Sequence, residues 1–176
     1  MAVSVEKNIY LVGPRASGKT SLGRLLAERL GRPFLDLDER FVEQTGRTVA
    51  QVVETEGWER FRELEHEVLA WAHANPGRVV ATGGGAALKA ANRDLLKQGV
   101  TVYLQADPER VVARLMADLL PEQRPALTDL PLEEEVRKTV AEREPYYLAV
   151  AHLVAPERPL EELAERIAAE LKAWKG

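Results

Sequence analysis

The chain has 176 residues, a length that suits one domain with a sizeable buried core. Its 24 basic and 28 acidic side chains give a formal net charge of −4, which excludes the broad basic surface that binds nucleic acid or acidic membranes. No apolar run approaches the length of a membrane span, about 20 residues. There is no cysteine, so disulfides and thiolate metal sites are excluded as well. We expect a single-domain, monomeric, cytoplasmic protein without a nucleic-acid or membrane partner.

A phosphate-binding motif follows the first predicted strand. Residues 8–12 form an apolar run typical of a buried parallel strand, and residues 13–20 then read G-x-x-x-x-G-K-T. An amphipathic helix ending at Gly31 is predicted next, because leucines recur three and four residues apart at Leu22, Leu25, Leu26 and Leu30. The motif therefore has the strand–loop–helix setting that it needs, and a chance match in a glycine-containing turn is the alternative.

This motif predicts a nucleotide site. Glycines let backbone N–H groups approach phosphates, and the amino end of a helix favours negative charge. Lys19 can then reach the β- and γ-phosphates of ATP, and the Thr20 hydroxyl can ligate Mg²⁺. The predicted ATP-binding residues of this segment are Gly13, Ala16, Ser17, Gly18, Lys19, Thr20 and Ser21.

Two carboxylates end the next predicted strand, residues 33–38. Asp36 and Asp38 would lie at the edge of the sheet, although Asp38 could equally be the N-cap of the helix that follows. A longer helix is predicted over residues 57–75. Arg62 lies at the edge of its apolar face, where a solvated surface arginine is the ordinary explanation.

Three consecutive glycines follow the buried strand predicted over residues 78–82. Most proteins with this phosphate loop place an aspartate at such a strand end to hold Mg²⁺. Here Gly83, Gly84 and Gly85 take that place, which lets the backbone approach a ligand closely, and an ordinary turn is the alternative. The metal then needs a carboxylate from elsewhere, and Asp36 is the best-placed candidate.

A segment without core periodicity interrupts the second half of the chain. A helix over residues 88–98, a strand over 100–104 and a further helix precede it. Residues 118–132 then contain three prolines and no regular apolar spacing, so we expect a mobile lid over about residues 117–131. Arg124 in this lid could act on bound phosphates, although a loop arginine without a function is the alternative.

The last predicted elements are a helix, a short strand and a closing helix. Residues 133–147 are helical in character, and Pro145 should end or kink that helix, which would place Arg143 near its carboxyl end. The strand is predicted over residues 151–154, and the closing helix starts at Pro159.

The alternation of strands and helices predicts an α/β fold with three layers, in which helices flank a central parallel sheet of about five strands. Ligands of such sheets bind at the carboxyl ends of the strands. The phosphate loop, the two aspartates and the three glycines all lie at predicted strand ends. We therefore expect them in one pocket.

Taken together, these motifs resemble the shikimate kinase family over nearly the whole chain. The combination that carries the resemblance is the phosphate loop, Asp36-x-Asp38, Gly57-x-x-x-Phe61-Arg62, Gly83-Gly84-Gly85, Arg124-Pro125-x-Leu127 and Arg143 ahead of a tyrosine pair. The resemblance implies a P-loop fold of the nucleoside-monophosphate-kinase type. It also implies that ATP phosphorylates the 3-hydroxyl of shikimate, a step of aromatic amino-acid synthesis.

The resemblance also assigns roles to residues. ATP and Mg²⁺ would be served by Lys19, Thr20, Asp36 and Arg124, the last closing over the phosphates. Shikimate would be bound, within a helical region of about residues 36–75 and the elements facing it, by Asp38, Arg62, Gly83, Gly84, Gly85 and Arg143. Lys19, Asp38 and Arg124 would be the catalytic residues. The chemistry suits this substrate, because arginines can hold its carboxylate while an aspartate orients its hydroxyls.

Two other functions fit part of the pattern. Another small-molecule kinase on this fold, such as a gluconate kinase, would also need to recognise an anion and hydroxyls. A nucleotide-dependent switch that drives a partner interaction would use the phosphate loop alone, and it would give no reason for Arg62, Arg143 and the three glycines.

Overall fold

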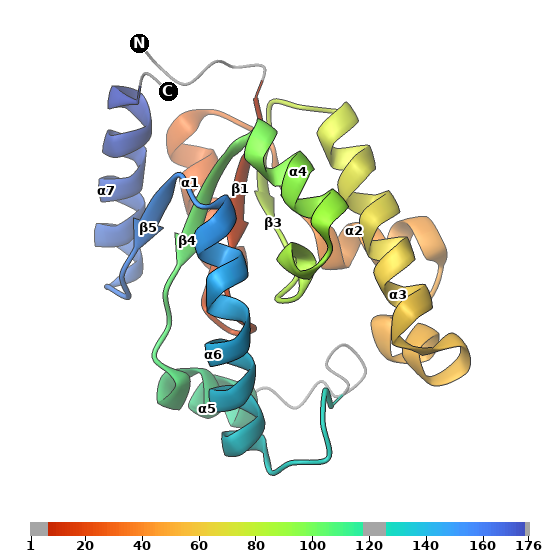
Figure 1. Ribbon diagram of the computed structural model, residues 1–176. Coiled ribbons are helices and arrows are strands. Elements are labelled where there is room, and N and C mark those ends of the chain that lie inside the picture. Colours follow the sequence, from red (N-terminus) through yellow and green to blue (C-terminus); the bar gives the residue numbers. More distant parts are fainter. Residues whose placement is uncertain (1–6, 118–125, 175–176) are drawn as a thin grey trace.

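The structure is a computed structural model that describes residues 7–117 and 126–174. One sheet of parallel strands has the order β2-β3-β1-β4-β5 (Figure 1). The strands are β1 (Ile9–Val12), β2 (Phe34–Asp36), β3 (Val79–Ala81), β4 (Val100–Leu104) and β5 (Leu153–Ala155). The α/β fold with a parallel sheet of five strands is therefore confirmed.

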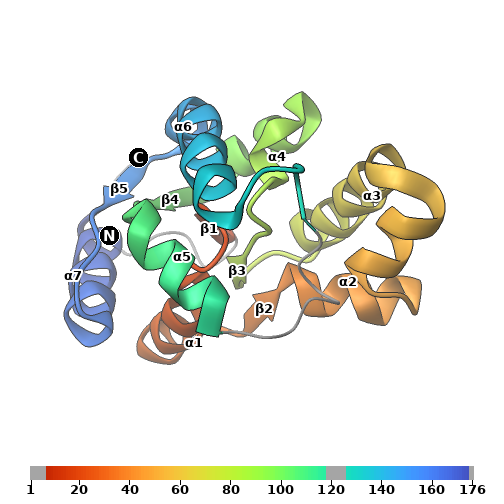
Figure 2. The same ribbon diagram turned by 90° about the horizontal axis from the view of Figure 1, so that it is seen from below.

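Helices connect the strands and cover both faces of the sheet. Within the described residues they are α1 (Lys19–Leu30), α2 (Leu37–Thr45), α3 (Val49–Ala74), the 3₁₀ turn η1 (Ala86–Leu88), α4 (Ala90–Gln98), α5 (Pro108–Ala117), α6 (Leu132–Val150) and α7 (Leu160–Ala173). Helices α1 and α7 pack on one face, and α3, α4 and α6 pack on the other (Figures 1 and 2). None of these helices has the length and apolarity needed to span a membrane.

Strand β1 lies at the centre of the sheet, between β3 and β4. All four of its residues are buried, because successive side chains enter opposite cores. Leu11 joins the cluster under α1 and α7, whereas Tyr10 joins the cluster under α3, α4 and α6. In β4, Val102 likewise joins the cluster under α1 and α7, and Tyr103 joins the one under α3, α4 and α6. This alternation builds the three layers.

Helix α2 begins one residue after Asp36, which is its N-cap. Oδ1 of Asp36 accepts hydrogen bonds from the backbone N–H groups of Asp38 at 2.8 Å and Glu39 at 3.3 Å. The alternative that made Asp38 the cap is therefore wrong. Asp38 lies in the first turn of the helix, and it is among the residues that line the large cleft described below.

Helix α6 continues through Pro145 to Val150, so the expectation that this proline ends the helix is wrong. A proline removes one hydrogen bond, the one its own N–H would have donated four residues back. The buried side chains of Val140, Tyr147 and Val150 hold the helix against the core on both sides of the proline. As a consequence Arg143 lies in the body of α6 rather than at its carboxyl end.

Helix α3 consists of two helical segments that meet at Gly57. Its backbone angles there, φ 85° and ψ 172°, belong to a region that glycine occupies almost alone. The first segment starts at Thr48, whose side chain accepts from Gln51 N–H at 3.1 Å while the Gln51 side chain accepts from Thr48 N–H at 2.9 Å.

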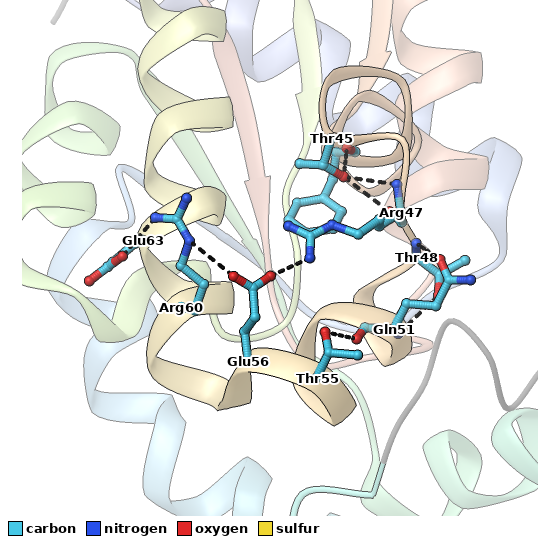
Figure 3. Close-up of polar contacts among 9 residues, drawn as sticks. Thr45, Arg47, Thr48, Gln51, Thr55, Glu56, Arg60 and Glu63 are labelled. Carbon is cyan, nitrogen blue, oxygen red and sulfur yellow. Dashed lines mark hydrogen bonds and ion pairs between the residues drawn. The ribbon is translucent and has the colours of Figure 1, made fainter.

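Exposed ion pairs bridge the two segments of α3. Figure 3 shows Glu56, the residue before the kink, between Arg47 and Arg60. Arg60 also pairs with Glu63 at 2.8 Å. Exposed pairs of this kind contribute at most about 1 kcal/mol each. The kink itself is made by Gly57, and the first turn of the second segment contributes Trp58, Phe61 and Arg62 to the large cleft described below.

Candidate active site

A cleft of about 1060 Å³ opens at the carboxyl ends of the strands. The predicted site residues that line it are Ala16, Ser17, Gly18, Lys19, Thr20, Ser21, Asp36, Asp38, Arg62, Gly83, Gly84, Gly85 and Arg143. Gly13 lies beside it, because its carbonyl oxygen accepts a hydrogen bond from Lys19. Arg124 lies outside the described residues.

The phosphate loop joins β1 to α1 and folds around the Lys19 side chain. Nζ of Lys19 donates to the carbonyl oxygens of Gly13 and Pro14, both at 2.7 Å. Ala16 has a positive φ of 55°, which helps to turn the loop. The Ser17 hydroxyl is buried and has no hydrogen-bond partner among the described residues. A buried hydroxyl without a partner, at the amino end of a helix, suits a site for an anionic ligand.

Thr20 and Asp36 meet at the edge of the phosphate loop. Oγ1 of Thr20 donates to Oδ2 of Asp36 at 2.7 Å, while Oδ1 of Asp36 caps α2. Hydroxyl and carboxylate oxygens suit Mg²⁺, which binds through one or two carboxylates together with substrate phosphates. In the described part of the chain, no cluster of three or more acidic, histidine or cysteine side chains could hold a metal by itself. The Thr20–Asp36 pair therefore fits a metal that arrives with a nucleotide.

Side chains from α2 and α3 fill the space that the glycine turn leaves open. A Cβ atom at Gly85 would lie 2.3 Å from Nη1 of Arg62, closer than real Cβ atoms approach. A Cβ atom at Gly83 would lie 3.1 Å from Oε2 of Glu65, a tight approach, and 3.5 Å from Oδ1 of Asp38. The turn therefore lacks side chains because a guanidinium and a carboxylate occupy the space next to it.

Helix α6 adds a second arginine to the same turn. A Cβ atom at Gly84 would lie 3.6 Å from Nη1 of Arg143 and 3.1 Å from the backbone nitrogen of Arg15. Burial lowers the pKa of Arg143, and the positive charge of Arg62 acts in the same direction. Two guanidinium groups thus share one end of the cleft, an arrangement that favours an anionic ligand.

Glu65 also lines the cleft, and the sequence analysis did not predict it as a site residue. This carboxylate is only 8% exposed, and its Oε1 accepts a hydrogen bond from Nη1 of Arg62 at 2.9 Å. Burial raises the pKa of Glu65, whereas the charges of Arg62, Arg143 and Lys89 oppose that rise. The spacing of Arg62 and Glu65, three positions apart on a helix, is the signal that could have identified it.

Tyr147 was also missed as a site residue. Its hydroxyl donates to the carbonyl oxygen of Gly84 at 2.5 Å and interacts with the Arg143 guanidinium. Its ring stacks on Tyr103, with centroids 5.1 Å apart. The tyrosine pair is visible in the sequence, but only the structure shows that Tyr147 points inward and that Tyr146 is 39% exposed.

The cleft continues beyond the phosphate loop toward α5 and the loop before α7. Nη1 of Arg114 donates to the carbonyl oxygen of Ala16 at 2.7 Å, and Nη2 pairs with Oε1 of Glu157 at 2.6 Å. Pro159 and Leu160 add apolar surface to this wall. Apart from Ala16, the sequence analysis assigned none of these residues to a ligand. The mixed wall suits the nucleoside half of a nucleotide whose phosphates lie in the loop.

A phosphate loop, a hydroxyl–carboxylate pair and a pocket with two arginines lie together on one parallel sheet, as in a P-loop kinase of small molecules. The family profile described as shikimate kinase matches residues 15–172. The chain is 47% identical over 165 residues to shikimate kinase 2 of Syntrophotalea carbinolica, covering 90% of this chain and 95% of that protein. The chain belongs to the shikimate kinase family.

Solved structures agree with this assignment. Shikimate kinase from Acinetobacter baumannii, solved in complex with shikimate, superposes with a TM-score of 0.89 at 39% identity, covering 97% of this chain and 95% of that one. A gluconokinase from Sinorhizobium meliloti has a TM-score of 0.59 at 21% identity, covering 96% and 95% of the two chains. The second likeness shows the shared fold alone.

Proposed function

We propose that this kinase transfers the γ-phosphoryl group of ATP to the 3-hydroxyl of shikimate and forms shikimate 3-phosphate. The observation that carries the proposal is the glycine turn with Asp38, Arg62 and Arg143 around it, in the same cleft as the phosphate loop. The relative solved with shikimate, which is 39% identical to this chain, supports the choice of acceptor.

The phosphate loop holds the donor. Backbone N–H groups of the loop and the amino end of α1 bind the phosphates of ATP, and the wall formed by Arg114 and Pro159 faces the nucleoside. Lys19 contacts the β- and γ-phosphates. We assign ATP binding to Gly13, Ala16, Ser17, Gly18, Lys19, Thr20, Ser21 and Arg124.

Thr20 and Asp36 hold Mg²⁺ together with the phosphates. The ion supplies positive charge next to the transferred group. The backbone N–H groups of Asp38 and Glu39 donate to Oδ1 of Asp36 and fix the orientation of that carboxylate. The Thr20 hydroxyl donates to the other carboxylate oxygen, Oδ2. The metal site is therefore positioned by the start of α2.

Arg62, Arg143 and the glycine turn bind the acceptor. The two guanidinium groups contact its single carboxylate, and Asp38 accepts hydrogen bonds from its hydroxyls. Asp38 orients the reacting hydroxyl and can take its proton. Because phosphoryl transfer passes through a loose transition state, orientation and charge neutralisation carry most of the catalysis.

The remaining assignments rest on the sequence. Arg124 completes the catalytic set with Lys19 and Asp38 when the lid, about residues 117–131, closes over both ligands. The acceptor-binding helical region comprises about residues 36–75 of a single kinase domain. We propose that the protein acts as a cytoplasmic monomer.

A coupled assay tests the proposal directly. With ATP and Mg²⁺, we expect turnover of shikimate and no comparable turnover of gluconate or nucleoside monophosphates. Lys19→Met should lower kcat by several orders of magnitude, whereas Lys172→Met on the exposed last turn of α7 should leave kcat unchanged. Retention of more than about a tenth of kcat by Lys19→Met, at most about 1.4 kcal/mol, would refute the role of Lys19. Absence of shikimate turnover in the unmodified protein would refute the function itself.

A further inference from the structure

The hydrogen bond from Tyr147 to Gly84 connects α6 to the turn that follows β3. The two residues are 63 positions apart, and the Tyr147 hydroxyl approaches the Gly84 carbonyl oxygen to 2.5 Å. Tyr147 is 1% exposed, and its ring stacks on Tyr103. The roles assigned above to the acceptor-binding residues leave this buried hydroxyl unused.

Each glycine carbonyl of the turn has a donor. Gly83 O accepts from Ala86 N–H and Gly85 O accepts from Leu88 N–H, both at 3.1 Å, and Tyr147 supplies the donor for Gly84 O. In contrast, the N–H groups of Gly84 and Gly85 donate to no backbone carbonyl oxygen within residues 7–117 or 126–174. Gly85 is buried and Gly84 is half-buried, and buried backbone donors are rarely left unpaired. These N–H groups are therefore available to a ligand in the cleft that the turn lines.

The bond from Tyr147 fixes the direction of one of these donors. In a trans peptide unit the C=O and N–H groups point in opposite directions. When Gly84 C=O points at Tyr147, the N–H of Gly85 in the same peptide unit points away from α6. Gly85 lies against the Arg62 guanidinium, since a Cβ atom there would come within 2.3 Å of its Nη1.

The same hydroxyl contacts the second arginine of the pocket. The Tyr147 hydroxyl donates to Gly84 and interacts with the Arg143 guanidinium, so one phenol group links a charged side chain and a backbone unit of the acceptor pocket. Burial raises the pKa of Tyr147 to about 12. The phenol therefore keeps its proton, and its donor role, throughout the pH range in which enzymes are assayed.

We propose that Tyr147 is a positioning residue that sets the affinity for the acceptor. It turns the Gly84–Gly85 peptide so that the N–H of Gly85 faces an oxygen of the acceptor, and it holds Arg143 beside that oxygen. This inference rests on the proposed function, which places shikimate against the glycine turn. The Tyr147 hydroxyl interacts with Gly84 and Arg143 of the acceptor pocket, whereas the residue also lines a small cavity together with Pro14 and Arg15 of the phosphate loop. We therefore expect its main effect on the acceptor.

The primary test is Tyr147→Phe, which removes one oxygen and keeps the stacked ring. We expect KM and Kd for shikimate to rise about three- to tenfold, the effect of one lost hydrogen bond, with KM for ATP changed less than about twofold. Tyr103→Phe, in the same stack, controls for loss of a buried hydroxyl, and Tyr146→Phe controls for an exposed one. A purely structural role would lower the melting temperature without separating the two KM values.

Two further measurements complete the test. In an Arg143→Ala background, Tyr147→Phe should raise the shikimate Kd by a smaller factor than in the unmodified protein, because part of its action passes through Arg143. In the unmodified protein labelled with ¹⁵N-glycine, shikimate should shift the Gly85 amide resonance, a result that does not depend on any variant folding. An unmoved Gly85 resonance at saturation would overturn the proposal.

The outcomes separate the two claims. If the unmodified protein phosphorylates shikimate and Tyr147→Phe behaves like Tyr103→Phe and Tyr146→Phe, the positioning role is wrong and the proposed function stands. If the unmodified protein does not phosphorylate shikimate, the proposed function is wrong and the positioning role falls with it.

Discussion

Nη1 of Arg62 lies 2.9 Å from Oε1 of Glu65, one turn further along α3, and both groups are largely buried. Glu65 therefore orients the guanidinium toward the glycine turn. The cost is a buried carboxylate, and such a pair is sensitive to the loss of either member, because the remaining charge keeps its desolvation penalty without its partner.

The first prediction concerns the two arginines of the pocket. Arg62→Ala and Arg143→Ala should each raise the Kd for shikimate about ten- to a hundredfold, because each removes a charge-assisted hydrogen bond to its carboxylate. The affinity for ATP should remain nearly unchanged. Calorimetry with each ligand measures both values, and Arg60→Ala, an exposed arginine on the same helix, is the control. Unchanged shikimate affinity in both variants would show that these arginines do not bind the carboxylate of shikimate.

The second prediction uses the pH dependence of stability. The raised pKa of Glu65 means that the folded state binds its proton more tightly than the unfolded state. The stabilisation from this group is complete below the unfolded pKa, about 4.3, and is lost as the pH rises through the higher folded pKa.

Glu65→Gln removes this titration. The free energy of unfolding of the unmodified protein, minus that of Glu65→Gln, should therefore decrease as the pH is raised from about 4 to about 8. Denaturant titrations at several pH values measure it, with the exposed Glu63→Gln as the matched control. A difference that stays constant over this range would contradict the prediction.

The third prediction concerns the space next to Gly85. Gly85→Ala places a methyl group against the Arg62 guanidinium and should weaken shikimate binding about as much as Arg62→Ala does. In an Arg62→Ala background the collision is relieved, so Gly85→Ala should then add little. Additive effects of the two substitutions would show that the methyl group acts elsewhere, since independent sites add.

The fourth prediction separates the two roles of Asp36. Asn is as good an N-cap as Asp, so Asp36→Asn should keep the stability of α2 while it removes the negative charge next to Thr20. The Mg²⁺ concentration needed for half-maximal activity should rise at least about tenfold, because Mg²⁺ prefers carboxylate ligands. Asp36→Ala should lower both the stability of α2 and the affinity for Mg²⁺. Thermal unfolding and a Mg²⁺ titration of each variant measure the two effects separately.

Local patterns predicted the elements that hold the phosphates. The strand before residue 13, the glycine-rich loop and the helix that ends at Gly31 each depend on neighbours in the sequence, and the structure has all of them. The N-cap of α2 was harder to predict, because the carboxylates of both Asp36 and Asp38 can accept hydrogen bonds from the first turn of a helix. The backbone hydrogen bonds to Asp36, rather than residue type, decide between them.

The contacts that complete the pocket could not be predicted, because they connect distant parts of the chain. Arg114 reaches Ala16 across 98 positions, and Tyr147 reaches Gly84 across 63. The predicted end of α6 at Pro145 was wrong for a related reason. Its local effect is to break a helix, but the packing of α6 on the sheet, which sequence periodicity does not reveal, outweighs the lost hydrogen bond.

The connection from β2 to β3 has a consequence for how such kinases diversify. These two strands pair directly, and residues 37–78 connect the end of β2 to the start of β3 outside the sheet. Changes within this connection therefore need not alter the pairing of the strands. Asp38, Arg62 and Glu65 all belong to this one excursion, whereas the phosphate loop precedes it. Changes within this one contiguous stretch can therefore alter three charged side chains of the acceptor pocket, whereas the glycine turn and Arg143 on α6 lie outside it. The phosphate loop lies outside this stretch, so such changes leave its sequence unaltered.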